Sequence, residues 1–176
     1  MSESSLEQLW AGWRHEYVTS ATASERHGRD NDHDGDDCVF CRIAASGPPS
    51  ADNFVVWRSA LGFAVLNAYP YASGHLLVMP VRHVGVLADL TEAESADLWD
   101  GTRQAVAAIT AAYDPDGVNM GANLGRAAGA GIPGHLHLHV LPRWSGDTNF
   151  MTSVAGVRVM PESLAVGWER LRAAWP

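Results

Sequence analysis

Hydrophobic and polar residues alternate most strictly in residues 134–144, which read Gly-His-Leu-His-Leu-His-Val-Leu-Pro-Arg-Trp. A repeat of two residues is the repeat of a β-strand, so the leucines and the valine are expected on a face that packs against a core. The polar positions are His135, His137 and His139, which the same repeat places in a row on the opposite face, roughly 7 Å from neighbour to neighbour. A strand face that only meets solvent would more often carry Thr, Lys or Glu, so the histidine row indicates a binding or catalytic role.

The other hydrophobic patterns predict a small sheet and one long helix. Apolar runs predict strands at residues 54–58, 63–67, 76–79 and 118–123, in addition to the histidine strand. Thr91 and Glu94 form a capping box at the start of a helix that extends to about Tyr113, where Asp-Pro-Asp-Gly ends it. Strands grouped around one long helix indicate the α+β class with a five-stranded antiparallel sheet.

Both ends of the chain carry helical patterns. Apolar residues recur at helical spacing in residues 4–20, which predicts an amphipathic N-terminal helix. A second helix is predicted from Pro161 onward by Leu164, Trp168, Leu171 and Trp175. The predicted organisation is an N-terminal helix (1–23), an acidic flexible linker (24–37), a domain (38–150) and a C-terminal extension with a helix (151–176).

Composition narrows the function. The chain has 176 residues and a formal net charge of −8. Nucleic acids and anionic membranes bind basic surfaces, so neither is an expected partner of this acidic chain. The 12 basic residues are all arginines, which excludes a catalytic lysine. The chain does not begin with a basic segment followed by an apolar run, and no apolar segment approaches the roughly 20 residues of a membrane span. The cytoplasm is the expected location.

Two chemistries suit the histidine row. Neutral imidazole binds zinc, and it is also a nucleophile toward phosphorus when a neighbouring imidazole holds the phosphate oxygens. Residues 124–134, which lead into the row, contain Gly125, Gly129, Gly131 and Gly134. Bare backbone lets amide N–H groups approach an anion closely, as in phosphate-binding loops. A glycine-rich segment in this place favours phosphate chemistry on a small phosphorylated ligand.

The two cysteines, Cys38 and Cys41, form a C-x-x-C pair. Such a pair can be half of a zinc site, a redox couple or two ordinary thiols. A redox couple of this kind is typical of a βαβ setting, which the chain does not predict. Half of a zinc site needs two further ligands, which histidines can supply, so zinc is the favoured interpretation of the three.

Three motifs together resemble the histidine-triad superfamily of nucleotide hydrolases and transferases. The row His-Leu-His-Leu-His-Val-Leu is similar to its H-φ-H-φ-H-φ-φ signature, and Cys-Val-Phe-Cys-Arg-Ile resembles its C-x-F-C-x-I motif. Residues 67–83 resemble its N-x-x-P-x-x-x-G-H-x-L-V-x-P-x-x-H block. The resemblance covers roughly residues 38–144 and implies the fold of that superfamily. Within it, the N-terminal helix and residues 142–150 look most like bacterial diadenosine tetraphosphate phosphorylases.

The resemblance implies a role for each matching histidine. His137 would be the nucleophile that attacks the α-phosphorus and forms a covalent nucleotidyl-histidine, and His139 would contact the phosphate. His135 and His75 would orient the row. The resemblance also implies that Asn67 hydrogen-bonds the ribose and that Asn123 takes the place of a phosphate-side amide.

The glycine-rich segment departs from the hydrolases of the superfamily. A G-Q-[ST]-V type segment is replaced by Gly-Ala-Gly-Ile-Pro-Gly at residues 129–134, so no Ser or Thr hydroxyl lies next to the phosphate. Bare N–H donors and positive charge suit a second anion better than a water-orienting hydroxyl does. The departure therefore favours inorganic phosphate as the acceptor, and the expected reaction is phosphorolysis of diadenosine tetraphosphate to ADP and ATP.

The expected substrate-binding residues are Asn67, Asn123, Gly129, Gly131, Arg143 and Trp144, with Arg126 as a further source of positive charge. The alternatives are a dinucleoside polyphosphate hydrolase, a nucleoside phosphoramidase and a nucleotide-binding sensor without turnover. The resemblance also implies a structural zinc ion on Cys38, Cys41, His83 and His135, in which case His135 would serve the metal and not the phosphate. It further implies a homodimer or a higher homo-oligomer.

Overall fold

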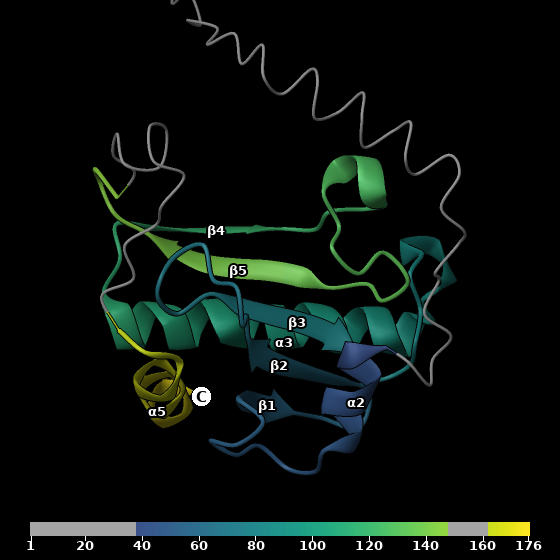
Figure 1. Ribbon diagram of the computed structural model, residues 1–176, viewed down its shortest axis with the longest axis horizontal. Coiled ribbons are helices and arrows are strands. Elements are labelled where there is room, and N and C mark those ends of the chain that lie inside the picture. The colour runs from purple at the N-terminus through teal and green to yellow at the C-terminus, as the bar shows by residue number, and fades with distance from the viewer. Residues whose placement is uncertain (1–37, 148–161) are drawn as a thin grey trace, which may run out of the picture. The chain divides into compact units, whose positions relative to one another are not determined.

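Five strands form one antiparallel sheet in the computed structural model, which describes residues 38–147 and 162–176 (Figure 1). The strands are β1 (Val55–Arg58), β2 (Gly62–Leu66), β3 (Leu76–Pro80), β4 (Gly117–Gly121) and β5 (Leu138–Arg143). Their order across the sheet is β1-β2-β3-β5-β4, and each pair of neighbours is antiparallel. The predicted α+β class and antiparallel sheet are therefore confirmed. The predicted N-terminal helix, the acidic linker and residues 148–161 lie outside the described residues.

The helices are α2 (Val39–Ala45), α3 (Glu92–Tyr113) and α5 (Leu164–Ala174), with short 3-10 turns η2 (Leu87–Asp89) and η3 (Arg126–Ala128). The capping box at the start of α3 is present: the Thr91 hydroxyl accepts the Glu94 N–H, and the Glu94 carboxylate accepts the Thr91 N–H. Helix α5 begins three residues later than predicted, because the hydroxyl of Ser163 accepts the Val166 N–H and caps the helix there. None of the described helices is long and apolar enough to cross a membrane.

The central strands β2 and β3 are buried on both faces, so they do not alternate between apolar and polar residues. On one face, residues such as Ala64 and Val78 pack with the buried side of α3. On the other face, residues such as Val65 and Leu77 pack with α2 (Figure 1). The sheet thus has a helix on each face, and the histidines lie on the α2 side.

The histidine strand is shorter than predicted. Strand β5 begins at Leu138, so His135 and His137 precede it and only His139 lies within the sheet. The N–H of Leu136 donates instead to the carbonyl of Val84 (2.7 Å), which holds this segment away from the ladder. Strand β4 ends at Gly121, opposite His139, and not at residue 123 as predicted, and β5 has only Leu138 beyond that point.

Candidate active site

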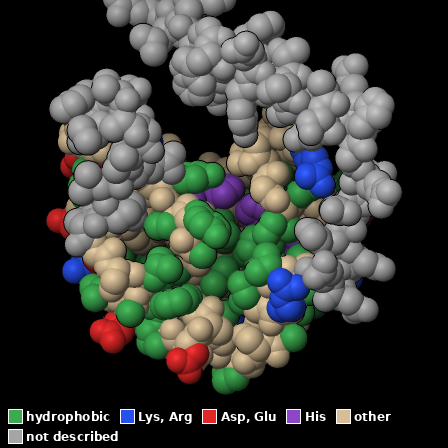
Figure 2. All heavy atoms as spheres, in the orientation of Figure 1, with side chains coloured by type: hydrophobic (Ala, Val, Ile, Leu, Met, Phe, Trp, Pro, Cys, Tyr) green, Lys and Arg blue, Asp and Glu red, His purple; other side chains and the backbone are tan. Residues whose placement is uncertain are grey.

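Three histidines meet where β3 lies beside β5. His75 directly precedes β3, His139 lies on β5 opposite Leu77, and His137 directly precedes β5. The ring centroids of His75 and His139 are 5.1 Å apart, as are those of His137 and His139. Figure 2 shows histidine side chains at the surface among hydrophobic and other uncharged groups, with the acidic side chains of this view at its periphery. We call His75, His137 and His139 the histidine relay.

The tautomer of His137 is set by a backbone carbonyl. Its Nδ1 lies 2.8 Å from the carbonyl oxygen of His135. A carbonyl can only accept, so Nδ1 carries the proton and donates it, and Nε2 of the neutral ring keeps its lone pair. Within the described residues Nε2 has no hydrogen-bond partner. His137 therefore presents a free nucleophilic nitrogen from a ring that is 7% exposed.

The tautomers of His75 and His139 follow from a second chain of contacts. The backbone N–H of Tyr71 donates to Nδ1 of His75 (3.1 Å), so this nitrogen is unprotonated in the neutral ring. The proton of His75 is then on Nε2, which lies 2.9 Å from Nδ1 of His139 and donates to it. As a result, His139 carries its own proton on Nε2.

This places a buried N–H donor beside His137. Nε2 of His139 is buried and has no hydrogen-bond partner among the described residues. Burial, and then the nearby His137, lower the pKa of His139 below its ordinary value, so the ring is neutral at pH 7. A buried donor without a partner is costly, which is a reason to expect a ligand oxygen there. The relay can thus attack a phosphorus atom with His137 while His139 holds an oxygen on it.

The loop before β3 supports the relay. Tyr71 stacks on the ring of His139, with centroids 5.7 Å apart and planes 17° apart, and it also contacts His75. Asn67 directs its Nδ2 to Nδ1 of His75 (3.3 Å), and its Oδ1 accepts the Tyr69 N–H (3.0 Å). Asn67 is thus beside the relay, and its expected contact with a ribose stays a prediction.

The glycine-rich segment is folded on itself. The N–H of Gly129 donates to the carbonyl of Arg126 (2.9 Å), and Asn123 directs its Nδ2 to the carbonyl of Gly129 (3.5 Å). Gly129 has φ +95°, in the left-handed region that favours glycine. Its N–H is therefore already used, whereas Gly131 is exposed, with open space where a Cβ would be. Of the two glycines expected to bind phosphate, Gly131 keeps the freer backbone.

The other expected sources of substrate contacts lie farther away. Arg143 is four residues beyond His139 on β5, a rise of about 13 Å, and its guanidinium is paired with Asp147 (2.5 and 2.8 Å). Trp144 follows it and packs edge-on against Tyr113, with centroids 6.4 Å apart. Arg126 lies exposed on η3. The structure does not bring Arg143 and Trp144 to the histidines, and their roles at a substrate stay predictions.

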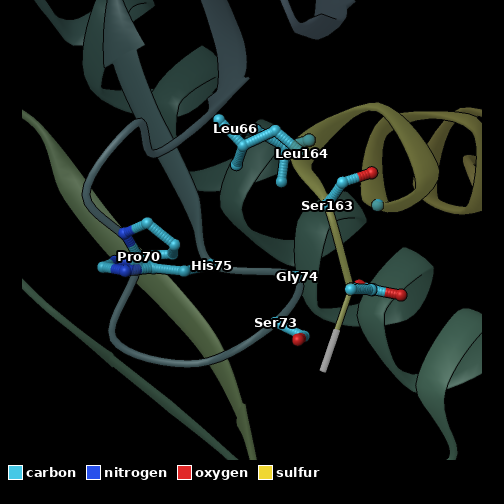
Figure 3. A pocket seen from close by; sticks show the side chains of 9 residues that line it. Leu66, Pro70, Ser73, Gly74, His75, Ser163 and Leu164 are labelled. Atoms are coloured by element: carbon cyan, nitrogen blue, oxygen red, sulfur yellow. The ribbon is translucent and has the colours of Figure 1, made fainter. Parts of the chain in front are cut away.

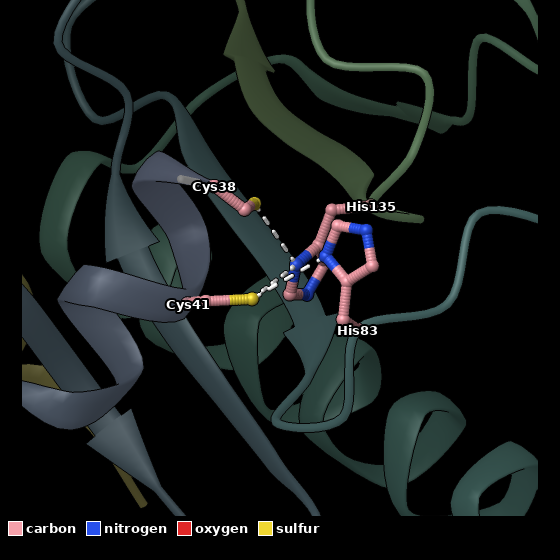
Figure 4. A group of neighbouring side chains, drawn as sticks. All are labelled: Cys38, Cys41, His83 and His135. Carbon is pink, nitrogen blue, oxygen red and sulfur yellow. Dashed lines mark hydrogen bonds between the residues drawn. The ribbon is translucent and has the colours of Figure 1, made fainter. Parts of the chain in front are cut away.

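A second group of side chains, the Cys2His2 cluster, lies at the N-terminal end of α2 (Figure 4). It consists of Cys38, Cys41, His83 and His135, whose sulfur and nitrogen atoms all lie within 4.8 Å of one another. Cys38 is the N-cap of α2, and Cys41 lies in its first turn. Nδ1 of His135 lies 3.5 Å from the Cys38 sulfur and 3.6 Å from the Cys41 sulfur, and Nδ1 of His83 lies 3.3 Å from the latter.

These distances fit a tetrahedral zinc ion. With Zn–S near 2.3 Å and Zn–N near 2.0 Å, the sulfur–nitrogen edge of a tetrahedron is about 3.5 Å. Nε2 of His135 lies 2.9 Å from the carbonyl of Pro80 and donates to it, so the lone pair is on Nδ1, the atom that faces both thiols. Burial also lowers the pKa of His135 to about 4, which keeps the ring in its neutral, metal-binding form.

His135 connects the two sites without belonging to both. Its ring lies in the Cys2His2 cluster, whereas its backbone carbonyl accepts from His137. The ring of Phe40 contacts both imidazoles, at 5.5 Å from His135 and 5.1 Å from His137. Of the two roles expected for His135, the placement of its side chain favours the metal.

Three residues that contact the histidines of the two sites were not among the expected site residues. Tyr71 and Phe40 pack on the relay, and the Pro80 carbonyl sets the tautomer of His135. Tyr71 lies inside the Asn-to-His block, so its position in that block was the available signal. The carbonyl of Pro80 has no signal in the sequence, because every residue type carries the same backbone oxygen.

The fold and the relay together define the histidine-triad class: an antiparallel sheet that presents a nucleophilic imidazole beside an imidazole donor. Residues 49–146 match the HIT domain, and the chain belongs to this family, as the motifs predicted.

Known relatives cover much of the chain. It is 39% identical over 171 residues to a protein named AP-4-A phosphorylase from Mycobacterium tuberculosis, a match that covers 97% of this chain and 85% of that protein. It is 37% identical over 93 residues to an asymmetrical bis(5'-nucleosyl)-tetraphosphatase of Schizosaccharomyces pombe, covering 53% of this chain and 50% of that protein. A Zn-bound histidine triad family protein from Mycobacterium smegmatis superposes with a TM-score of 0.63 at 28% identity, covering 80% of this chain and 94% of that one.

Proposed function

We propose that this protein catalyses the phosphorolysis of diadenosine tetraphosphate to ADP and ATP. The observation that carries the proposal is the hydrogen bond from Nδ1 of His137 to the His135 carbonyl (2.8 Å), because it leaves Nε2 nucleophilic beside the His139 donor. The relative named AP-4-A phosphorylase, 39% identical over 97% of this chain, supports the substrate and the reaction.

The proposed reaction has two displacements at the same phosphorus. In the first, Nε2 of His137 attacks the α-phosphorus, the bond from that phosphorus to the bridging oxygen breaks, and ATP leaves. In the second, an oxygen of inorganic phosphate attacks the nucleotidyl phosphorus, the P–N bond breaks, and ADP leaves with His137 restored. Through both steps, His139 donates its Nε2–H to a non-bridging oxygen, where negative charge gathers in the transition state.

Phosphate as the acceptor requires room for a second anion. The segment at residues 129–134 has no hydroxyl that could orient a water molecule, and Gly131 offers exposed backbone. Backbone N–H groups can bind phosphate whatever side chain the residue carries. This arrangement supports phosphate over water.

Product analysis tests the proposal. Diadenosine tetraphosphate is incubated with the protein, with and without inorganic phosphate, and the nucleotides are separated. We expect equal amounts of ADP and ATP, formed at a rate that rises with phosphate. AMP and ATP formed at the same rate with and without phosphate would show a hydrolase. Adenosine phosphoramidate cleaved far faster than any dinucleotide would show a phosphoramidase, and tight nucleotide binding without any product would show a sensor.

We also propose that the Cys2His2 cluster binds a structural zinc ion. Two thiolates and two imidazoles complete a closed tetrahedral site with no position for substrate, so the metal would supply stability and no chemical step. It would join α2 to the segments that carry His83 and His135. The Zn-bound histidine triad protein from Mycobacterium smegmatis supports this choice of metal.

Metal analysis decides between zinc and two ordinary thiols. Protein purified without chelator is expected to contain one zinc per chain, and the Cys41→Ser variant much less. Well under one zinc per chain in the wild-type protein would remove the proposal. A redox couple would instead show a disulfide between Cys38 and Cys41 that forms and breaks reversibly at full activity.

The exposed edge of β4 supports a homodimer, which we propose as the assembly. Strand β4 pairs with β5 on one side, carries no charged residue or proline, and exposes Met120 to 45%. Such an edge is usually protected or paired. Light scattering should give twice the chain mass, and Met120→Lys should shift it toward the monomer. The proposed location is the cytoplasm, a reducing compartment in which cysteines without a disulfide, such as Cys38 and Cys41, stay reduced.

A further inference from the structure

Tyr113 connects the histidine relay to helix α5. It is the last residue of α3, and its ring packs against Gly74, the residue directly before His75. A Cβ atom on Gly74 would lie 2.5 Å from Cε2 of Tyr113 and 2.9 Å from its Cζ. Gly74 also has φ +75°, so the backbone here needs a glycine for its conformation as well as for this contact. The ring of Tyr113 therefore fixes the position of the backbone at Gly74, from which the next residue, His75, projects.

The other end of Tyr113 is held at the start of α5. Its hydroxyl donates to Oε1 of Glu162 (2.5 Å). Arg170 completes the group, with Nη1 3.6 Å from Oε2 of Glu162 and its guanidinium carbon 5.0 Å from the centre of the tyrosine ring. Burial, and then the bond to Glu162, raise the pKa of Tyr113 well above its ordinary value, so the hydroxyl keeps its proton. Glu162 and Arg170 therefore hold the tyrosine in place from the α5 side.

Elsewhere the loop and α5 are separated. A cavity of about 170 Å³ lies between them (Figure 3). It is lined on the loop side by Ser73, Gly74 and His75, and on the helix side by Glu162, Ser163 and Leu164. Empty space on this side of the loop gives residues 73–75 somewhere to move if the tyrosine ring is lost. Tyr113 is thus the support that keeps His75 on the relay side of the cavity.

We propose that Tyr113 is a positioning residue for His75, and that α5 takes part in nucleotidyl transfer through the Glu162–Tyr113 pair. The inference rests on the proposed function and extends it, because α5 lies outside the HIT domain match at residues 49–146. If His75 shifts, its Nε2–H no longer meets Nδ1 of His139, and the proton of His139 is no longer confined to Nε2. The phosphate then loses its donor in part of the molecules.

Three variants and one control test the inference in the full chain. Tyr113→Leu removes the ring and the hydroxyl, Tyr113→Phe removes the hydroxyl alone, and Glu162→Ala removes the acceptor. Gln104→Ala is the matched control, because Gln104 accepts the Trp175 Nε1–H (2.9 Å) and so also joins α3 to α5, at a contact that does not involve Gly74 or His75. Each variant is assayed for kcat and KM of ADP formation, and for thermal unfolding.

We expect kcat to fall roughly tenfold in Tyr113→Leu and about threefold in Glu162→Ala, with KM within about twofold of wild type. Tyr113→Phe keeps the ring against Gly74 but loses the bond to Glu162, so its kcat should be close to that of Glu162→Ala and well above that of Tyr113→Leu. Gln104→Ala should keep the wild-type kcat even if its unfolding temperature falls. A kcat for Tyr113→Leu close to that of wild type, or an equal loss in Gln104→Ala, would overturn the inference.

Nitrogen-15 NMR of labelled histidine provides a readout that needs no substrate. In the wild type, His75 and His139 should each show a single tautomer with the proton on Nε2, and in Tyr113→Leu both should show averaged tautomers. His75 unchanged in Tyr113→Leu would refute the positioning role. If Tyr113→Leu does not fold, Glu162→Ala, which removes the contact that holds the tyrosine hydroxyl from the α5 side, should show a smaller averaging of the same two tautomers. A wild type without phosphorolysis would refute the proposed function, whereas the tautomer result would still decide the role of Tyr113.

Discussion

The Cys2His2 cluster and the histidine relay both use imidazole side chains. His135 of the cluster and His137 of the relay are only two residues apart, yet their ring nitrogens are arranged differently. His135 donates from Nε2 to the Pro80 carbonyl and turns the lone pair of Nδ1 toward two thiols. His137 donates from Nδ1 to the His135 carbonyl and leaves the lone pair of Nε2 free. His139 accepts at Nδ1 and is left with a donor at Nε2. The partner of one ring nitrogen therefore decides whether the other offers a lone pair, as a metal ligand or a nucleophile needs, or an N–H donor.

The sharpest way to separate the two sites is to remove the proposed nucleophile, His137. His137→Asn keeps a side chain of similar polarity but has no nucleophilic nitrogen, so kcat should fall by roughly a thousandfold or more. Zinc content and unfolding temperature should stay near those of wild type, because His137 is not in the cluster. Steady-state kinetics and metal analysis on the same preparation check both halves. A variant with more than about a tenth of the wild-type rate would show that another group attacks the phosphorus.

Removing a ligand of the cluster should produce the opposite pattern. Cys38→Ser should lose the metal and lower the free energy of unfolding by about 3 kcal/mol or more, because three segments lose their common anchor. For a chain of this size that corresponds to a fall in Tm on the order of 10 °C. Activity per folded molecule should fall much less than in His137→Asn. Calorimetry with and without chelator measures the effect, and a wild type indifferent to chelator would argue against a structural metal.

The role of His75 in the relay can be tested by truncating its side chain. His75→Ala removes the donor that fixes His139, while the nucleophile His137 and its carbonyl partner stay in place. We expect kcat to fall roughly 10- to 100-fold, while the rate still rises with phosphate. Trapping of the nucleotidyl-enzyme should still succeed, more slowly. If His75→Ala abolished trapping altogether, His75 would have to act on the nucleophile and not through His139.

The smallest effect on stability is expected at the ion pair next to the Cys2His2 cluster. Arg82 precedes His83, a member of the Cys2His2 cluster, and is paired with Glu94 at the start of α3 (2.7 and 2.8 Å). The bond to Arg82 is the main cause that lowers the pKa of Glu94 to about 2. A lowered pKa means that the stabilising contribution is complete above the ordinary value near 4.5 and is lost as the pH falls toward 2.

Glu94→Gln should therefore lower Tm by a few degrees at pH 7, and the difference from wild type should shrink as the pH is lowered through 4. Thermal unfolding of the two proteins side by side at several pH values checks this, since contributions that both share cancel. A difference independent of pH would mean that the carboxylate charge is not what Arg82 requires.

Much of the fold could be predicted because its signals are local. The capping box of Thr91 and Glu94 and the apolar runs of β2 and β3 depend on neighbours in sequence. Helix α2 was missed because Val39–Ala45 is shorter than the window in which a helical repeat can be recognised. The histidine row was extended too far toward its N-terminus, because alternation continues through His135 although the backbone bonds there go to Val84.

In the candidate site, too, some features could be predicted from local motifs and others depend on the folded chain. The identities of the relay and cluster residues follow from motifs, whereas the tautomers depend on the carbonyls of Pro80 and His135 and on the N–H of Tyr71, which only the folded chain brings into place. The distance of Arg143 from the histidines likewise depends on where β5 begins and how its side chain pairs with Asp147.

Residue 135 serves the cluster with its imidazole and the relay with its carbonyl, and this gives the two sites a thermodynamic connection. A metal ion that restrains the ring restrains the same peptide unit that orients His137. If bound metal strengthens the binding of a nucleotide analogue at His137 by some factor, reciprocity requires that the analogue strengthen metal binding by the same factor. Two sites with separate chemistry would then share one coupling free energy through a single residue.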